Sequence, residues 1–129
     1  REDQRSNLGQ VAQQAADFIN HFDGELISTL AVITEVCHLL DFNVRAQLNF
    51  LEWTRRGGLT LAELDVKDFV RITELMQKYA DLPMDFADAT LVVLAERLVL
   101  NEIITIDKDF TIYRLFRNQP FRNVLIPQA

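Results

Sequence analysis

The chain has 129 residues, which is the size of one compact domain, so we expect residues 1–129 to form a single domain. Hydrophobic residues make up 49% and charged residues 25% of the sequence, a globular composition that excludes a disordered tail or a fibre. The formal net charge is −6, which excludes a general affinity for polyanions, and any nucleic-acid contact needs a local basic patch or bound cations. One cysteine excludes a disulfide framework and a cysteine-based zinc site. We expect a soluble cytoplasmic protein, because the first ten residues are too polar for a signal peptide and no apolar run reaches about 18 residues.

The first half of the chain begins with apolar residues that recur at helical spacing. Residues 8–22 carry one apolar face and predict a helix, which Gly24 ends. The short apolar run over residues 26–30 predicts a buried strand, and it continues directly into a helical pattern over residues 31–40. The sequence therefore predicts a strand that leads straight into a helix.

The middle of the chain repeats this alternation. Asn43 is a typical N-cap for a further helix, which Gly57–Gly58 closes. Residues 59–64 alternate leucine with smaller or polar residues, as a strand with one buried face does. Asp65 begins the next helix, and its spacing to Asp68 predicts a pair of acids that cap the helix N-terminus.

The last part of the chain holds the most apolar segment. Residues 86–100 are apolar on nearly every side and predict a helix that lies between layers. Residues 102–107 predict a strand, residues 110–116 a helical turn and residues 123–126 a last strand. Strands separated by long helices pair in parallel, so we predict an α/β fold, a three-layer α/β/α sandwich with a central, mainly parallel sheet. Ligands of such sheets bind beyond the carboxyl ends of the strands.

Five acidic residues stand out by their context. Glu35 interrupts an apolar stretch, where a carboxylate needs a cation, a donor or water, but it equally fits the exposed stripe of an amphipathic helix. Asp85 and Asp88 fit the cap and first turn of the apolar helix. Asp107 and Asp109 fit a turn at a strand end and a cap for the next short helix. Taken singly, each residue is explained at least as well by a structural role.

The same acids have a second interpretation when they are placed on the predicted fold. Glu35, Asp88 and Asp107 all fall at the edge of the sheet where ligands bind. Carboxylates that converge without matching cations repel each other strongly. A set of oxygen ligands suits Mg²⁺ or Mn²⁺, and a site of this kind orients and deprotonates a water and neutralises a phosphodiester. Nearby Cys37 and His38 are predicted to be packing groups.

Three motifs occur in an order that resembles a known family. TEVCHLL (34–40) follows a short apolar strand, YADLPMDFADATLVVLAERL (79–98) holds the apolar helix, and ITIDKDF (104–110) ends the next strand. This arrangement resembles the PIN domain, the metal-dependent ribonuclease fold of VapC-type toxins, from the first helix to the C-terminus. The resemblance implies a hydrolase that cleaves RNA with Mg²⁺ or Mn²⁺, either as the toxin of a toxin–antitoxin pair or as a related nuclease.

The resemblance also assigns roles to individual residues. It makes Glu35, Asp88 and Asp107 the catalytic metal ligands, while Asp85 and Asp109 assist as adjacent acids. Family habit implies a homodimer, for which the helix face with Val44, Leu48 and Leu51 offers an interface, and a protein antitoxin as a possible partner. The segment from residue 110 to the C-terminus has arginines and no acids, so Arg114 and Arg117 are the first choice for the RNA phosphate track, with Arg55 and Arg56 as a second basic spot.

One part of the family pattern has no counterpart here. PIN domains open with a central strand that carries a metal-binding aspartate, whereas this sequence begins beyond that point. We expect an N-terminal truncation, because two unpaired edges would otherwise lie inside the sheet, and the alternatives are loss in processing or a natural variant. The chain as it stands is then expected to be impaired in catalysis. The alternative function is a non-catalytic PIN-like module that binds RNA or protein, and a phosphoacceptor receiver domain is a weaker third.

Overall fold

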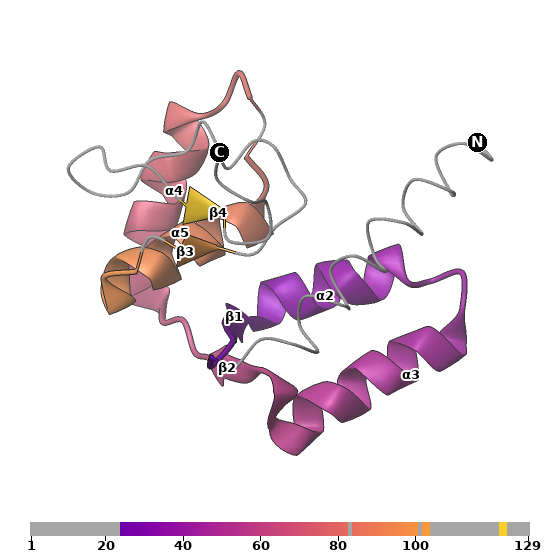
Figure 1. The fold of residues 1–129 in the computed structure, drawn as a ribbon. Helices are drawn as coiled ribbons and strands as arrows, with labels where there is room; N and C mark the ends of the chain where they lie inside the picture. The colour runs from indigo at the N-terminus through magenta and orange to yellow at the C-terminus, as the bar shows by residue number, and fades with distance from the viewer. Residues whose placement is uncertain (1–23, 83, 101, 104–121, 124–129) are drawn as a thin grey trace.

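Short strands alternate with helices along the chain, as the sequence pattern predicts (Figure 1). The computed structural model describes residues 24–82, 84–100, 102–103 and 122–123. In chain order the elements are β1 (Ile27–Thr29), α2 (Leu30–Leu39), α3 (Val44–Trp53), a wide helical turn (Thr54–Gly58), β2 (Thr60–Ala62), a 3-10 turn (Val66–Asp68), α4 (Phe69–Lys78), α5 (Phe86–Leu98), β3 (Glu102–Ile103) and β4 (Arg122–Asn123). The predicted helix over residues 8–22 and the predicted helical turn over residues 110–116 lie outside the described residues.

The strands pair in parallel. β1 pairs with β2, with Ile27 opposite Thr60, and β3 pairs with β4, with Glu102 opposite Arg122. Parallel neighbours need a long crossover connection, which α2 and α3 supply between β1 and β2. The predicted α/β class with parallel strands is confirmed, and the arrangement is consistent with the α/β/α sandwich.

The predicted helix boundaries follow from local capping. The Asn43 side chain accepts hydrogen bonds from the N–H groups of Arg45 (2.9 Å) and Ala46 (3.3 Å) and so begins α3. Asp65 and Asp68 form a reciprocal capping box ahead of α4, as their spacing predicts. The turn after α3 ends at the predicted glycine pair, where Gly57 has a φ of 97° that favours glycine. These starts and stops are therefore set by residues close in sequence.

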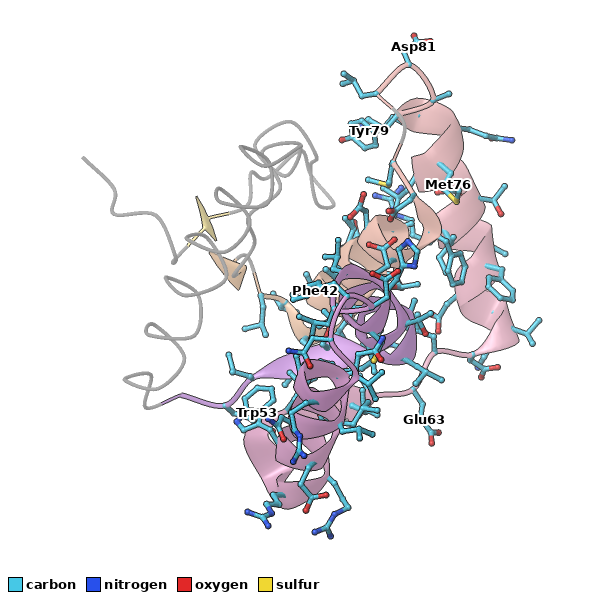
Figure 2. The ribbon with its side chains drawn as sticks, turned by 90° about the vertical axis from the view of Figure 1, so that its right-hand side faces the viewer. Phe42, Trp53, Glu63, Met76, Tyr79 and Asp81 are labelled. Carbon is cyan, nitrogen blue, oxygen red and sulfur yellow. The ribbon has the colours of Figure 1, made fainter. Side chains whose placement is uncertain are left out.

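The described core lies between α4 and α5. α5 packs against α4 and also contacts α2 and β1, so the predicted position of this apolar helix between other elements is confirmed. Tyr79, which directly follows α4, is buried, whereas Met76 of α4 is 37% exposed (Figure 2). The core cluster consists of Ile72, Leu75, Tyr79, Met84, Ala89, Val92 and Val93.

Two arginines join α4 and the preceding turn to α5. Arg71 donates from Nε and Nη2 to the two carboxylate oxygens of Glu96, at 3.0 Å and 2.9 Å, and the Glu96 side chain is only 3% exposed. Arg97 binds the carboxylate of Asp68 and donates to the carbonyl of Glu63. The Arg97 guanidinium lowers the pKa of Asp68 below its ordinary value, and the Asp65 N–H adds to this effect. Charge pairing thus reinforces the apolar contact of these helices.

The outer face of α3 is exposed to solvent, unlike the faces of α4 and α5 that form the core. None of its residues is buried, and Val44, Leu48 and Leu51 are 64%, 58% and 41% exposed. The predicted interface residues are therefore accessible, and the homodimer stays a prediction. No helix in the described ranges has the length and apolar character needed to cross a membrane.

Candidate active site

Glu35 lies in the second turn of α2 with an exposed side chain. Together with Thr34, His38 and Leu39 it lines an open depression of about 410 Å³. The apolar face of α2 turns the other way, because Ile33 is the buried residue of this helix. The structure thus places Glu35 on the exposed stripe of α2, where its side chain is accessible to solvent.

His38 follows Glu35 at a spacing of three residues, which puts both on the same side of the helix. The prediction that His38 is a packing group is wrong, because its side chain is exposed and lines the same depression. The neighbouring leucines suggested burial, but helical spacing relative to Glu35 was the better signal. Cys37 is half-buried, and its backbone carbonyl accepts a hydrogen bond from Gln47 Nε2 of α3 at 2.6 Å.

Asp85 and Asp88 form the capping box of α5. Asp85 Oδ1 accepts a hydrogen bond from the Asp88 N–H at 2.8 Å, and the Asp85 N–H donates to Asp88 Oδ2 at 3.3 Å. The structural role predicted for both acids is confirmed. A carboxylate has several acceptor positions, so this bond orients Asp88 and is compatible with a further ligand.

A pair of buried threonines connects the two helices that carry these acids. Thr29, the last residue of β1 and the N-cap of α2, lies 2.9 Å from Thr90 of α5 between their Oγ1 atoms. Because α2 packs against α5, the helix with Glu35 and the helix with Asp88 are neighbours. Sequence reasoning missed both threonines, although the position of Thr90 within the predicted apolar helix was an available signal for one of them.

The structure does not describe the remaining predicted site residues. Asp107, Asp109, Arg114 and Arg117 lie outside the described residues. Within the described ranges, no group of three or more acidic, histidine or cysteine side chains is arranged to hold a metal ion. The complete ligand set therefore stays a prediction. The second basic spot is also less basic than predicted, because Arg55 and Arg56 both bind Glu52.

The family model described as "PIN domain" matches residues 9–114, which is most of the chain and includes α2, α5 and the ITIDKDF motif. A search of the curated proteins finds no match. PIN domains have an α/β fold, are generally nucleases and typically use divalent metal ions.

Proposed function

This chain belongs to the PIN domain family, and from this premise we propose that it is a metal-dependent endoribonuclease that hydrolyses RNA phosphodiester bonds. The observation that carries the proposal is the packing of α2 against α5, which makes neighbours of the helices with Glu35 and Asp88. Asp107 belongs to the same family match and is the third acid of the proposed site.

The donor chemistry of these side chains fits a divalent cation. Carboxylate oxygens are the ligands that Mg²⁺ and Mn²⁺ prefer, and Glu35, Asp88 and Asp107 would hold the ion with help from Asp85 and Asp109. Bound there, the ion would lower the pKa of a water molecule and neutralise charge on the phosphodiester. The chain's own contribution is orientation, since the Asp85 N–H fixes one oxygen of the Asp88 carboxylate.

The RNA substrate is the other half of the proposal. The net charge of −6 and the acidic site both repel a polyanion, so the phosphate track must come from basic residues outside the site. We assign this role to Arg114 and Arg117, because the C-terminal segment beyond residue 109 contains no acidic residue. Arg55 and Arg56 contribute less to RNA binding, because both form ion pairs with Glu52, which neutralises part of their charge.

The test is Mn²⁺-dependent RNA cleavage by the full-length protein, and its loss on Asp88→Asn. Asparagine still accepts the capping bond, so the variant removes the charge of one ligand and keeps the helix start. We expect cleavage to fall about 100-fold or more, because even groups outside the direct ligand set change metal sites by about 10–100-fold. Asp81→Asn is the matched control. This exposed acid lies in the turn after α4, and its replacement should leave cleavage unchanged (Figure 2).

Two results would redirect the proposal. Full cleavage by Asp88→Asn would rule out the acidic site as the source of activity. Binding of RNA with no cleavage at any Mn²⁺ concentration would favour the non-catalytic PIN-like module instead.

The toxin role, the antitoxin partner and the homodimer are finer parts of the same proposal. A ribonuclease toxin arrests growth when it is expressed alone, so the wild-type chain should slow growth of a bacterial host and Asp88→Asn should not. For the homodimer we propose the exposed apolar face of α3, which includes Val44 and Leu48.

A further inference from the structure

The threonine pair that joins α2 to α5 consists of hydroxyl groups with almost no exposure to solvent. Thr29 is 2% and Thr90 is 1% exposed, and 61 positions of sequence separate them. Buried hydroxyls are costly unless they are hydrogen-bonded, whereas valine has nearly the same shape and no polar atoms. Valine at these two positions would therefore fill the space between α2 and α5 equally well. The hydrogen bonds of the two hydroxyl groups must have another role than filling space.

The direction of the hydrogen bonds follows from counting protons. A hydroxyl has one proton, and Thr90 Oγ1 donates its proton to the Ala87 carbonyl at 2.6 Å. Thr29 is therefore the donor in the bond between the two threonines. Thr29 Oγ1 in turn accepts from the Val32 N–H in the first turn of α2, at 3.4 Å. Each hydroxyl thus donates once and accepts once.

The same series of bonds continues into the capping box of α5. The Ala87 carbonyl that accepts from Thr90 and the Asp88 N–H belong to one peptide group. That N–H donates to Asp85 Oδ1 at 2.8 Å, and the Asp85 N–H returns a bond to Asp88 Oδ2. Hydrogen bonds in series polarise and strengthen one another. The series therefore runs from the first turn of α2 to the carboxylate of Asp85, and a separate hydrogen bond from the Asp85 N–H holds the carboxylate of Asp88.

The other end of the series fixes the start of the helix that carries Glu35. Thr29 has extended backbone angles (φ −118°, ψ 160°) and is the N-cap of α2. Its hydroxyl thus has two functions, since it begins α2 and attaches that beginning to α5.

We propose that Thr29 and Thr90 are positioning residues for the divalent cation: their hydrogen bond holds α2 and α5 at the separation at which Glu35 and Asp88 bind one ion. This inference rests on the proposed function, because it assumes that both acids are ligands. Neither threonine is assigned contact with the ion or the RNA.

The test is the affinity of the full chain for Mn²⁺, measured from the electron paramagnetic resonance signal of the free ion. Thr90→Val keeps the shape of the side chain and removes the bond to Thr29. We expect the Kd for Mn²⁺ to rise about 10-fold, the lower end of the effect of groups that orient metal ligands. Thr90→Ser restores the hydroxyl and should stay within about threefold of the wild type.

The control is an exposed threonine whose hydroxyl also donates to a carbonyl of its own helix, and for which the described residues show no hydrogen bond to another helix. Thr73 of α4 donates to the Phe69 carbonyl at 2.7 Å and is exposed, so Thr73→Val should leave the Mn²⁺ affinity unchanged. If Thr90→Val fails to fold, Thr90→Cys replaces it, since it differs from Thr90→Ser only in having a larger sulfur atom, which is a weaker donor and a weaker acceptor than the hydroxyl oxygen.

The outcomes separate the inference from the proposed function. Wild-type affinity in Thr90→Val, or in Thr90→Cys where the valine variant does not fold, would overturn the inference even if RNA cleavage is intact. Absence of Mn²⁺ binding by the wild-type chain would overturn both. An affinity that falls in Thr90→Val and returns in Thr90→Ser supports positioning, because loss of stability alone does not change the Kd of the folded protein.

Discussion

The α4–α5 pair and the α2–α3 pair are built from similar helical patterns but differ in burial. α4 and α5 contribute nearly all of the described core, including Leu75 and Val92 with no exposed surface. α2 buries only Ile33, and α3 buries none of its residues. A periodic apolar pattern therefore predicts that a helix forms and which of its faces is apolar. It does not predict how much of that face another element covers.

The candidate site lies where these two regions meet. Asp88 begins α5, which belongs to the well-packed region, whereas Glu35 belongs to the less buried α2. α5 contacts both α4 and α2, so it links the two halves (Figure 1). Substitutions in the two regions should consequently have different effects on stability.

The largest expected difference is between two leucines. Leu75→Ala removes a fully buried side chain from the core of α4 and α5, and should lower the free energy of unfolding by about 2–5 kcal/mol. Leu48→Ala replaces a residue of α3 that is 58% exposed, and should change the free energy of unfolding by about 0.5 kcal/mol or less. Urea unfolding of both variants measures the two values. Equal losses would show that α3 is covered as well as α4 is.

The sequence predicts the local part of this fold well. Asn43, the Asp65–Asp68 pair and the Asp85–Asp88 pair act on backbone groups within three residues, so their spacing alone reveals their role. The strand over residues 26–30 is predictable for a similar reason, because a short apolar run next to a glycine is typical of a buried strand.

The site is less accessible to sequence reasoning, because its contacts join distant positions. The bond between Thr29 and Thr90 depends on how β1 and α5 pack, and no local pattern encodes a separation of 61 residues. Asp88 illustrates the same limit. Its residue type and its spacing from Asp85 predict the capping box. Only the order of the motifs along the chain, which matches the PIN family, indicates that Asp88 is also a metal ligand.

The next prediction concerns the buried charge pair of the well-packed region. Glu96→Gln removes the charge that Arg71 binds through two hydrogen bonds, in a side chain that is 3% exposed. We expect the free energy of unfolding to fall by about 1.5–3 kcal/mol, the usual value of hydrogen bonds to charged groups. Glu52→Gln is the matched control, because the Glu52 carboxylate likewise accepts hydrogen bonds from arginine, here from Arg55 and Arg56, but is exposed to solvent. A loss in the control as large as that in Glu96→Gln would contradict the role given to burial.

The smallest expected effect is the acid sensitivity that Asp68 contributes. Arg97 and the Asp65 N–H lower the pKa of the folded carboxyl below the ordinary value of about 4. The unfolded state therefore takes up this proton first as the pH falls, and the stabilisation present at neutral pH is lost below about pH 4. Asp68→Asn should remove about 1 kcal/mol or less at pH 7, since Arg97 is 42% exposed, and should flatten the decline below pH 4. Unfolding free energies measured between pH 7 and pH 3 test this point. Curves of the variant and the wild type that stay parallel throughout would show that Arg97 does not stabilise the charged form of Asp68.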